Sequence, residues 1–144
     1  MDANEVLRAL LTAMPYWNAG VVRPLKQSLA GQMSAETYYC LELLRQRGGL
    51  SMTEIAVALR ITKQQATRLV ERLAQYEMVE RVTGAQDRRQ VLISITPAAT
   101  KYLGNIAVES ERYLDLLQER LTDDERRRLA GALVVISELL QKLA

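Results

Sequence analysis

The residues from 62 to 75 have the types and spacing needed to bind a nucleic acid. One apolar stripe recurs at helical spacing and predicts a buried helix face, formed by Ala66, Leu69, Val70 and Leu73. The opposite face carries mostly amide, hydroxyl and guanidinium groups, which can hydrogen-bond base edges or phosphates. These side chains are Gln64, Thr67, Arg68, Glu71 and Gln75, flanked by Lys63 and Gln65 near the helix start. A face that is only solvated would favour Glu–Lys pairs four residues apart, so binding is the better interpretation.

A second group of charged side chains follows at the tip of a predicted hairpin. Residues 78–82 alternate as in a strand, residues 84–89 turn the chain, and residues 91–95 return it as a second strand. The tip holds Asp87, Arg88 and Arg89. Between positions 60 and 89 there are seven basic residues, Arg72 among them, against four acidic ones, although the net charge of the whole chain is only +2. The positive surplus therefore lies where side chains could contact phosphates.

The sequence contains start signals for the helices that would position these groups. Ser51 and Glu54 form a capping box ahead of a short apolar helix, and Thr62 can cap the next one. Two short helices joined by a tight turn, followed by a hairpin with arginines at its tip, are the layout of a winged helix-turn-helix. In that layout the second helix enters the major groove, and the wing reaches the neighbouring minor groove or the backbone.

Four consecutive motifs in these elements resemble the MarR (multiple antibiotic resistance regulator) family of transcriptional regulators. They are Arg68-Leu69-Val70-Glu71-Arg72-Leu73, Val79-Glu80-Arg81, Asp87-Arg88-Arg89 and Leu92-Ile93-Ser94-Ile95-Thr96-Pro97. The chain departs from the family at Gly84 and Gln86, where the family usually has an acidic residue and an arginine, and at Ala99, where it has a glycine. The order and spacing of four motifs make the resemblance specific.

The resemblance implies a sequence-specific DNA-binding transcriptional regulator, of the ligand-responsive repressor kind, that acts as a homodimer on an inverted-repeat operator. The expected partners are double-stranded DNA, a second copy of the chain and a small effector that could be aromatic. The DNA contacts are expected from Lys63, Gln64, Gln65, Thr67, Arg68, Arg72, Asp87, Arg88 and Arg89.

Two interpretations of Asp87 remain open, because a carboxylate at the tip of a DNA-contacting hairpin is repelled by phosphate. In the family, the arginine matching Arg89 contacts the minor groove, and the aspartate matching Asp87 orients arginines through a charge-assisted hydrogen bond. Alternatively, Asp87 is a turn residue whose side chain bonds its own backbone. The first interpretation predicts that Asp87→Asn weakens DNA binding, and the second allows this substitution to be silent.

The two ends of the chain are predicted to be apolar helices. We expect one kinked helix from about Asn4 to about Ala30, bent at Pro15, and a second helix from Ser34 to Gly48 with Tyr38, Leu41 and Leu44 buried. Beyond the hairpin, one long helix should run from Thr96 to about Leu121, followed by a last helix that starts at Thr122 and is apolar on more than one stripe. Packing on a second copy best explains such surfaces.

The predicted fold is therefore mainly α, a single winged helix-turn-helix domain over residues 1–144 with a short β-hairpin wing. Residues 34–95 form the DNA-binding part, and residues 1–33 and 96–144 form flanking dimerisation helices. A content of 49% hydrophobic residues, without a run long enough to span a bilayer, predicts a globular cytoplasmic protein. With no histidine and one cysteine, we expect no disulfide, no metal, no cofactor and no enzymatic activity.

The remaining candidates are aromatic residues and the single cysteine. Core or dimer packing is the commoner role of each aromatic residue, but as a group some belong to helices that border a small-molecule pocket in the family: Tyr16, Trp17, Tyr38, Tyr39 and Tyr113. Cys40 is expected to be a small hydrophobic residue of the core. Two other functions stay open: a redox-sensing regulator that uses this cysteine, and a winged-helix protein-interaction module without DNA binding. The second would favour acidic or apolar residues at positions 64, 68 and 89, which the sequence lacks.

Overall fold

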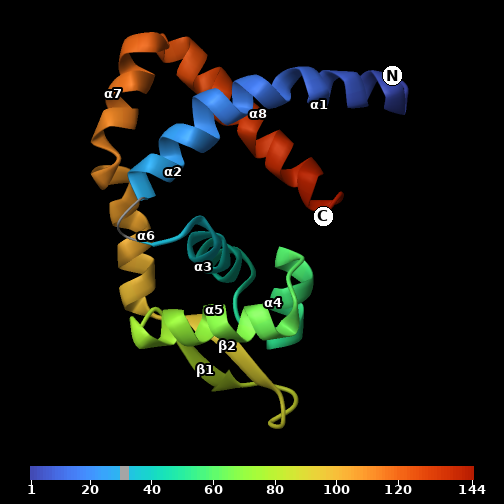
Figure 1. Cartoon of the computed structure of the whole chain (residues 1–144), viewed down its shortest axis with the longest axis vertical. Coiled ribbons are helices and arrows are strands. Elements are labelled where there is room, and N and C mark those ends of the chain that lie inside the picture. The colour runs from blue at the N-terminus through green and yellow to red at the C-terminus, as the bar shows by residue number, and fades with distance from the viewer. Residues whose placement is uncertain (30–32) are drawn as a thin grey trace.

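The computed structural model describes residues 1–29 and 33–144 and consists of helices with one two-stranded sheet. Along the chain, the elements are α1 (Ala3–Trp17), the π-helical segment η1 (Asn18–Val22), α2 (Arg23–Leu29), α3 (Ala35–Arg47), α4 (Met52–Leu59), α5 (Lys63–Gln75), β1 (Val79–Thr83), β2 (Val91–Ile95), α6 (Pro97–Glu109), α7 (Glu111–Arg120) and α8 (Asp123–Gln141). Figure 1 shows α3 to β2 gathered at one end, with α6 leading away to α7, α8 and the N-terminal helices.

The hydrophobic core lies among α3, α4, α5 and the hairpin. Its largest buried side chains include Leu41, Leu44, Ile55 and Ile93. The apolar stripe predicted on α5 is confirmed, since Ala66, Leu69, Val70 and Leu73 are all buried. The strands pair antiparallel, with Arg81 opposite Ile93, and Leu50 bridges to Ile93 on the outer side of β2. This core therefore fixes both the orientation of α5 and the position of the wing.

The predicted helix starts are confirmed at atomic detail. Ser51 accepts the backbone N–H of Glu54, and the Glu54 carboxylate accepts that of Ser51. The same reciprocal box forms at the start of α5 and at the start of α8, and Ser34 and Thr96 cap α3 and α6. Each cap satisfies backbone donors that a helix leaves unpaired at its N-terminus. These polar residues thereby define where each of these helices begins, α5 included.

The N-terminal helix is interrupted, but not at the proline. Pro15 lies inside α1, and the irregular segment follows as η1, where the N–H of Arg23 reaches back five residues to the carbonyl of Asn18. A π-helical segment adds a residue per turn, so it reorients the apolar stripe without a break in the chain. The predicted end of this helix at Ala30, and most of the connection from 31 to 33, lie outside the described residues.

Two other details differ from the sequence prediction. In α3 the buried face contains Thr37 and Cys40 with Leu41 and Leu44, whereas Tyr38 is only half-buried. The predicted helix from Thr96 to Leu121 is divided at Ser110, whose backbone leaves the helical region at φ −87° and ψ 40°. The Ser110 hydroxyl donates to the carbonyl of Ile106 at 2.9 Å. A serine hydroxyl that bonds a carbonyl in the preceding turn often bends a helix.

The helices at the chain ends carry large apolar surfaces. Neither α1 nor α8 has a buried residue. Their exposed apolar side chains include Val6, Leu7, Leu10, Leu11 and Met14 on one helix, and Val134, Val135, Ile136, Leu139 and Leu140 on the other. In the part of the chain that the structure describes, no helix is both long and apolar enough to cross a membrane.

Candidate nucleic-acid interface

A single exposed stripe runs along α5 opposite its buried face. It consists of Gln64, Arg68, Glu71 and Gln75, which follow one another at spacings of three or four residues and are all exposed. The turn that precedes α5 is tight: Arg60 adopts a left-handed conformation at φ 54°, and the N–H of Ile61 bonds the carbonyl of Ala56 at 3.0 Å. Since the opposite stripe is fixed in the core, the four side chains project from the outer face of α5, where Glu71 and Gln75 also border a groove beside β1.

The residues beside this stripe differ in how free their polar groups are. Thr67 is half-buried and donates its hydroxyl to the carbonyl of Lys63 at 2.9 Å, which leaves its oxygen as an acceptor. The side-chain carbonyl of Gln65 accepts the N–H of Thr62 at 2.9 Å within the capping box. Gln65 therefore keeps only its NH₂ group for another partner. Lys63 is exposed at the start of the helix.

Arg72 lies on the flank of α5 that faces α3 and α6. Although exposed, it lines a small cavity of about 160 Å³ together with Tyr76, Met78 and Tyr102. This places Arg72 apart from the central stripe, at the edge of the face that was predicted from the sequence. A phosphate contact suits such a marginal position better than a base contact.

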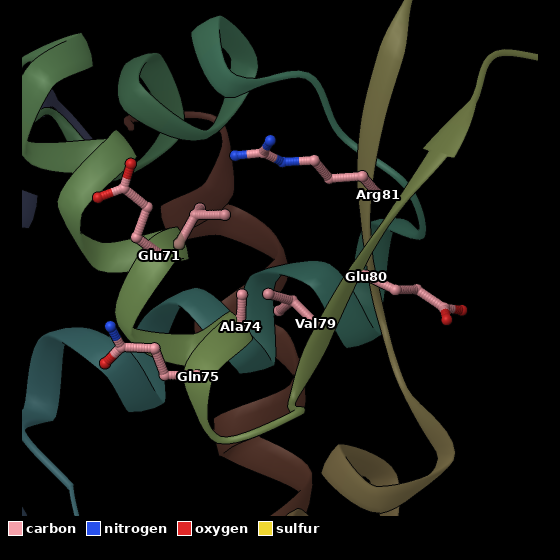
Figure 2. A pocket seen from close by; sticks show the side chains of 7 residues that line it. Glu71, Ala74, Gln75, Val79, Glu80 and Arg81 are labelled. Atoms are coloured by element: carbon pink, nitrogen blue, oxygen red, sulfur yellow. The ribbon is translucent and has the colours of Figure 1, made fainter.

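An open groove of about 620 Å³ separates α5 from the wing. Figure 2 shows Glu71 on the helix wall and Arg81 on the strand wall, while Glu80 extends to the other side of β1. Side chains alternate along a strand, so Arg81 lies on the same side as the buried Val79. The sequence prediction did not include Arg81 or Glu71 among the site residues. The alternation of residues 79 to 81 was the available signal for Arg81.

The tip of the wing is a closed turn held by backbone contacts. The N–H of Gly84 donates to the carbonyl of Gln90 at 2.8 Å, and the N–H of Gln90 donates to the carbonyl of Asp87 at 3.1 Å. The Asp87 carboxylate accepts the backbone N–H of Arg89 at 2.9 Å. A Cβ atom on Gly84 would lie 2.7 Å from the Asp87 carbonyl oxygen, which explains why this loop has no larger residue there.

The wing arginines are exposed and available to a ligand. Arg88 and Arg89 are both exposed, and the ion pairs found among the described residues involve only Glu42 with Arg45 and Asp123 with Arg126 and Arg127. Asp87 thus contacts the backbone of Arg89 and not an arginine side chain. This contact supports the interpretation of Asp87 as a turn residue.

The structure does not bring the five candidate aromatic residues together. Tyr38 and Tyr39 are neighbours, with ring centroids 6.1 Å apart, but Tyr16 on α1 is 78% exposed. Tyr39 and Tyr113 line different cavities. Trp17 is also exposed, at the end of α1. The five residues therefore do not form one common site in this structure.

Cys40 lies in the core, as the sequence predicts. Its side chain is fully buried, and this burial raises the pKa of the Cys40 thiol to about 11. A thiol is nucleophilic only as the thiolate, so this cysteine is protonated and shielded at neutral pH. This environment disfavours the redox-sensing alternative.

The helix α5 is anchored in the core by its apolar face, and the hairpin that follows it carries arginines at its tip. These two features define this protein as a winged helix-turn-helix. Residues 32–90 match the model of the MarR family. A putative transcriptional regulatory protein for the hcr operon of Thauera aromatica is 29% identical over 96 residues, covering 67% of this chain and 58% of that protein. The match thus spans little more than half the length of this curated relative. Residues 32–90, which run from before α3 to the tip of the wing, are thus similar to the MarR family.

Solved structures agree with this fold over nearly the whole chain. A MarR family protein from Bacillus stearothermophilus superposes with a TM-score of 0.73 at 17% identity, covering 97% of this chain and 99% of that one. A mutant of MepR from S. aureus, solved bound to an oligodeoxyribonucleotide, has a TM-score of 0.59 at 21% identity, with coverage of 97% and 99%. The predicted winged-helix fold with a hairpin wing is therefore confirmed.

Proposed function

We propose that this chain is a sequence-specific DNA-binding transcriptional regulator that acts in the cytoplasm as a homodimer on an inverted-repeat operator. The observation that carries this proposal is the exposed stripe of α5, where Gln64 and Arg68 project opposite a fully buried stripe. An amide pairs well with adenine and a guanidinium with guanine in the major groove. The family match supports the same conclusion.

The wing supplies the second set of DNA contacts in this proposal. Arg88 and Arg89 are exposed at the tip of the hairpin, which follows α5 in the chain. A helix in the major groove places such a wing over the adjacent minor groove or the backbone. Positive side chains there would add affinity that depends on salt and little on sequence.

The dimer in this proposal forms through the apolar surfaces of α1 and α8, together with the long α6–α7 segment. Exposed surfaces of this kind favour association with a second copy. Two-fold symmetry then places the two α5 helices on half-sites about 10 base pairs apart, or a multiple of that distance.

The proposal also includes regulation: binding of a small effector releases the protein from its operator. A hollow of about 550 Å³ between α2 and α7, lined in part by Gln27, Tyr113 and Leu116, is large enough for a small molecule. This hollow lies next to the helices assigned to the dimer. A molecule bound in it would therefore change the distance between the two α5 helices. This supports repression that an effector relieves.

The substitution Arg68→Ala tests whether the exposed stripe of α5 contacts bases. The operator is first selected from a random DNA pool, and binding of each variant is then titrated on that operator and on random DNA. Loss of a bidentate base contact should cost about 1–3 kcal/mol on the operator and little on random DNA. Arg72→Ala is the matched control, because it removes the same charge from the flank of α5. Equal losses on both DNAs for Arg68→Ala would assign it to phosphate instead.

The protein-interaction alternative makes a different prediction in the same experiment. A winged-helix module without DNA binding would enrich no motif from the random pool, and its weak DNA binding would be abolished by moderate salt. The exposed arginines of the wing and the polar stripe of α5 favour the DNA-binding function.

A further inference from the structure

Glu71 lies at the centre of the exposed stripe on α5. It is exposed and follows Arg68 by three residues. Within the described residues it takes part in no ion pair, although Arg68 and Arg72 lie close to it in the helix. Its carboxylate oxygens are therefore available to a partner outside the protein.

The position of Glu71 creates an electrostatic problem for a DNA-bound helix. A carboxylate in the major groove is repelled by the phosphates of both strands, so it is unfavourable unless it accepts a hydrogen bond from a base. Cytosine offers its N4 amino group there, whereas guanine and thymine present only acceptor atoms. A carboxylate at this place would thus exclude guanine and thymine. It favours cytosine over adenine, because the N7 acceptor beside the N6 amino group of adenine repels a carboxylate.

The groove beside Glu71 reduces the cost of placing this charge near DNA. Arg81 lies on the facing wall, and the open space of about 620 Å³ separates the helix from β1 (Figure 2). Since Glu71 and Arg81 form no ion pair in the described structure, the arginine is free to face the DNA backbone. Its positive charge would offset part of the repulsion between Glu71 and the phosphates.

We propose that Glu71 is a specificity-determining residue that accepts a hydrogen bond from the N4 amino group of a cytosine in each half-site. This inference rests on the proposed function. Glu71 follows Gln64 by seven residues, which is about 10 Å along the helix axis. Because successive bases of one strand are about 3.4 Å apart, the two residues read positions roughly three base pairs apart.

Selection from a random DNA pool, with sequencing of the bound fraction, tests this assignment. The wild-type protein should enrich cytosine at one position of each half-site. Glu71→Gln should replace that preference with adenine, since a carboxamide pairs with N6 and N7 of adenine. Glu71→Ala should lose the preference without a replacement. Affinity of Glu71→Gln for the wild-type operator should fall at least about fivefold, the lower end expected for one base contact.

Glu80→Gln is the matched control, because it removes the same charge from a carboxylate that points to the other side of β1 (Figure 2). It should leave the selected motif unchanged. If the wild-type protein selects no motif, the proposed function itself is wrong. If it selects an inverted repeat and Glu71→Gln selects the same one, or binds all sequences more tightly, only the role of Glu71 is wrong. Equal unfolding midpoints would show that both variants keep the fold.

Discussion

The hydroxyl of Tyr113 on α7 donates a hydrogen bond of 2.7 Å to the backbone carbonyl of Gly20, which lies 93 residues earlier in the chain. Gly20 belongs to the π-helical segment η1 (Asn18–Val22). Such segments leave backbone groups without their usual intrahelical partners, and here a side chain from α7 satisfies one of them. Tyr113 therefore joins η1, near the start of the chain, to α7.

Removal of this hydroxyl should lower stability without a change of fold. We expect Tyr113→Phe to reduce the free energy of unfolding by about 1 kcal/mol, the usual net value of one hydrogen bond. Urea denaturation at a fixed protein concentration measures this, because the stability of a dimer depends on concentration. Tyr16→Phe is the matched control, since Tyr16 is 78% exposed. An equal loss in both variants would mean that the bond to Gly20 contributes nothing specific.

The helix starts and the buried face of α5 could be predicted from the sequence because local rules determine them. A capping box such as Ser51 with Glu54 needs only residues three apart, and the apolar stripe of α5 needs only helical periodicity. The division at Ser110 could not be predicted in this way. Serine is tolerated inside helices, and its effect depends on whether its hydroxyl bonds the preceding turn.

Contacts between distant segments account for the other differences. The bond from Tyr113 to Gly20 joins residues 93 positions apart that no local pattern relates. The groove between Glu71 and Arg81 depends on how β1 packs beside α5, which helical or strand periodicity alone does not give. The exposed face of α5 was visible from the sequence, but the division of that face into a central stripe and a flank with Arg72 required the packing of α3 and α6. The roles of the DNA-contacting residues remain predictions.

The wing offers a test of what Asp87 does. Its carboxylate accepts the backbone N–H of Arg89 at 2.9 Å, and an asparagine side chain can accept the same bond. We expect Asp87→Asn to change DNA affinity by less than about twofold, since asparagine and aspartate serve turns equally well. Asp87→Ala should weaken binding, because it loses the bond that shapes the turn. Clear weakening by Asp87→Asn in a titration would support the family-based role, in which the carboxylate orients an arginine side chain.

The dimer can be tested through the exposed apolar face of α8. Leu139 is 52% exposed in a single protomer. We expect Leu139→Glu to raise the dimer dissociation constant by at least about tenfold, because a carboxylate without a partner is costly in an apolar interface. Light scattering at micromolar concentrations would measure the change in mass. Val91→Glu is the control, because Val91 is 50% exposed on β2, which is not among the helices assigned to the dimer. A monomeric wild-type protein would contradict the proposed assembly outright.

The buried thiol of Cys40 predicts a specific pH dependence of stability. Burial raises its pKa to about 11, whereas an exposed thiol in the unfolded chain has a pKa of about 8.5. The folded state therefore holds its proton to higher pH than the unfolded state does. The resulting stabilisation is present in full below about pH 8.5 and is lost as the pH rises toward about 11, by up to roughly 1.4 kcal/mol per pH unit.

Urea denaturation of the wild-type protein and of Cys40→Ala from pH 7 to pH 10.5 would isolate this contribution. Cys40→Ala should be less stable at neutral pH, because it leaves a small cavity in the core. The difference between the two proteins should then shrink as the pH rises, since only the wild-type protein loses the contribution of the thiol. At pH 7.5, iodoacetamide should modify Cys40 only in unfolded protein, because the thiol is fully buried in the folded chain. Rapid modification of the folded protein would show an accessible thiolate and make the redox-sensing function the better hypothesis.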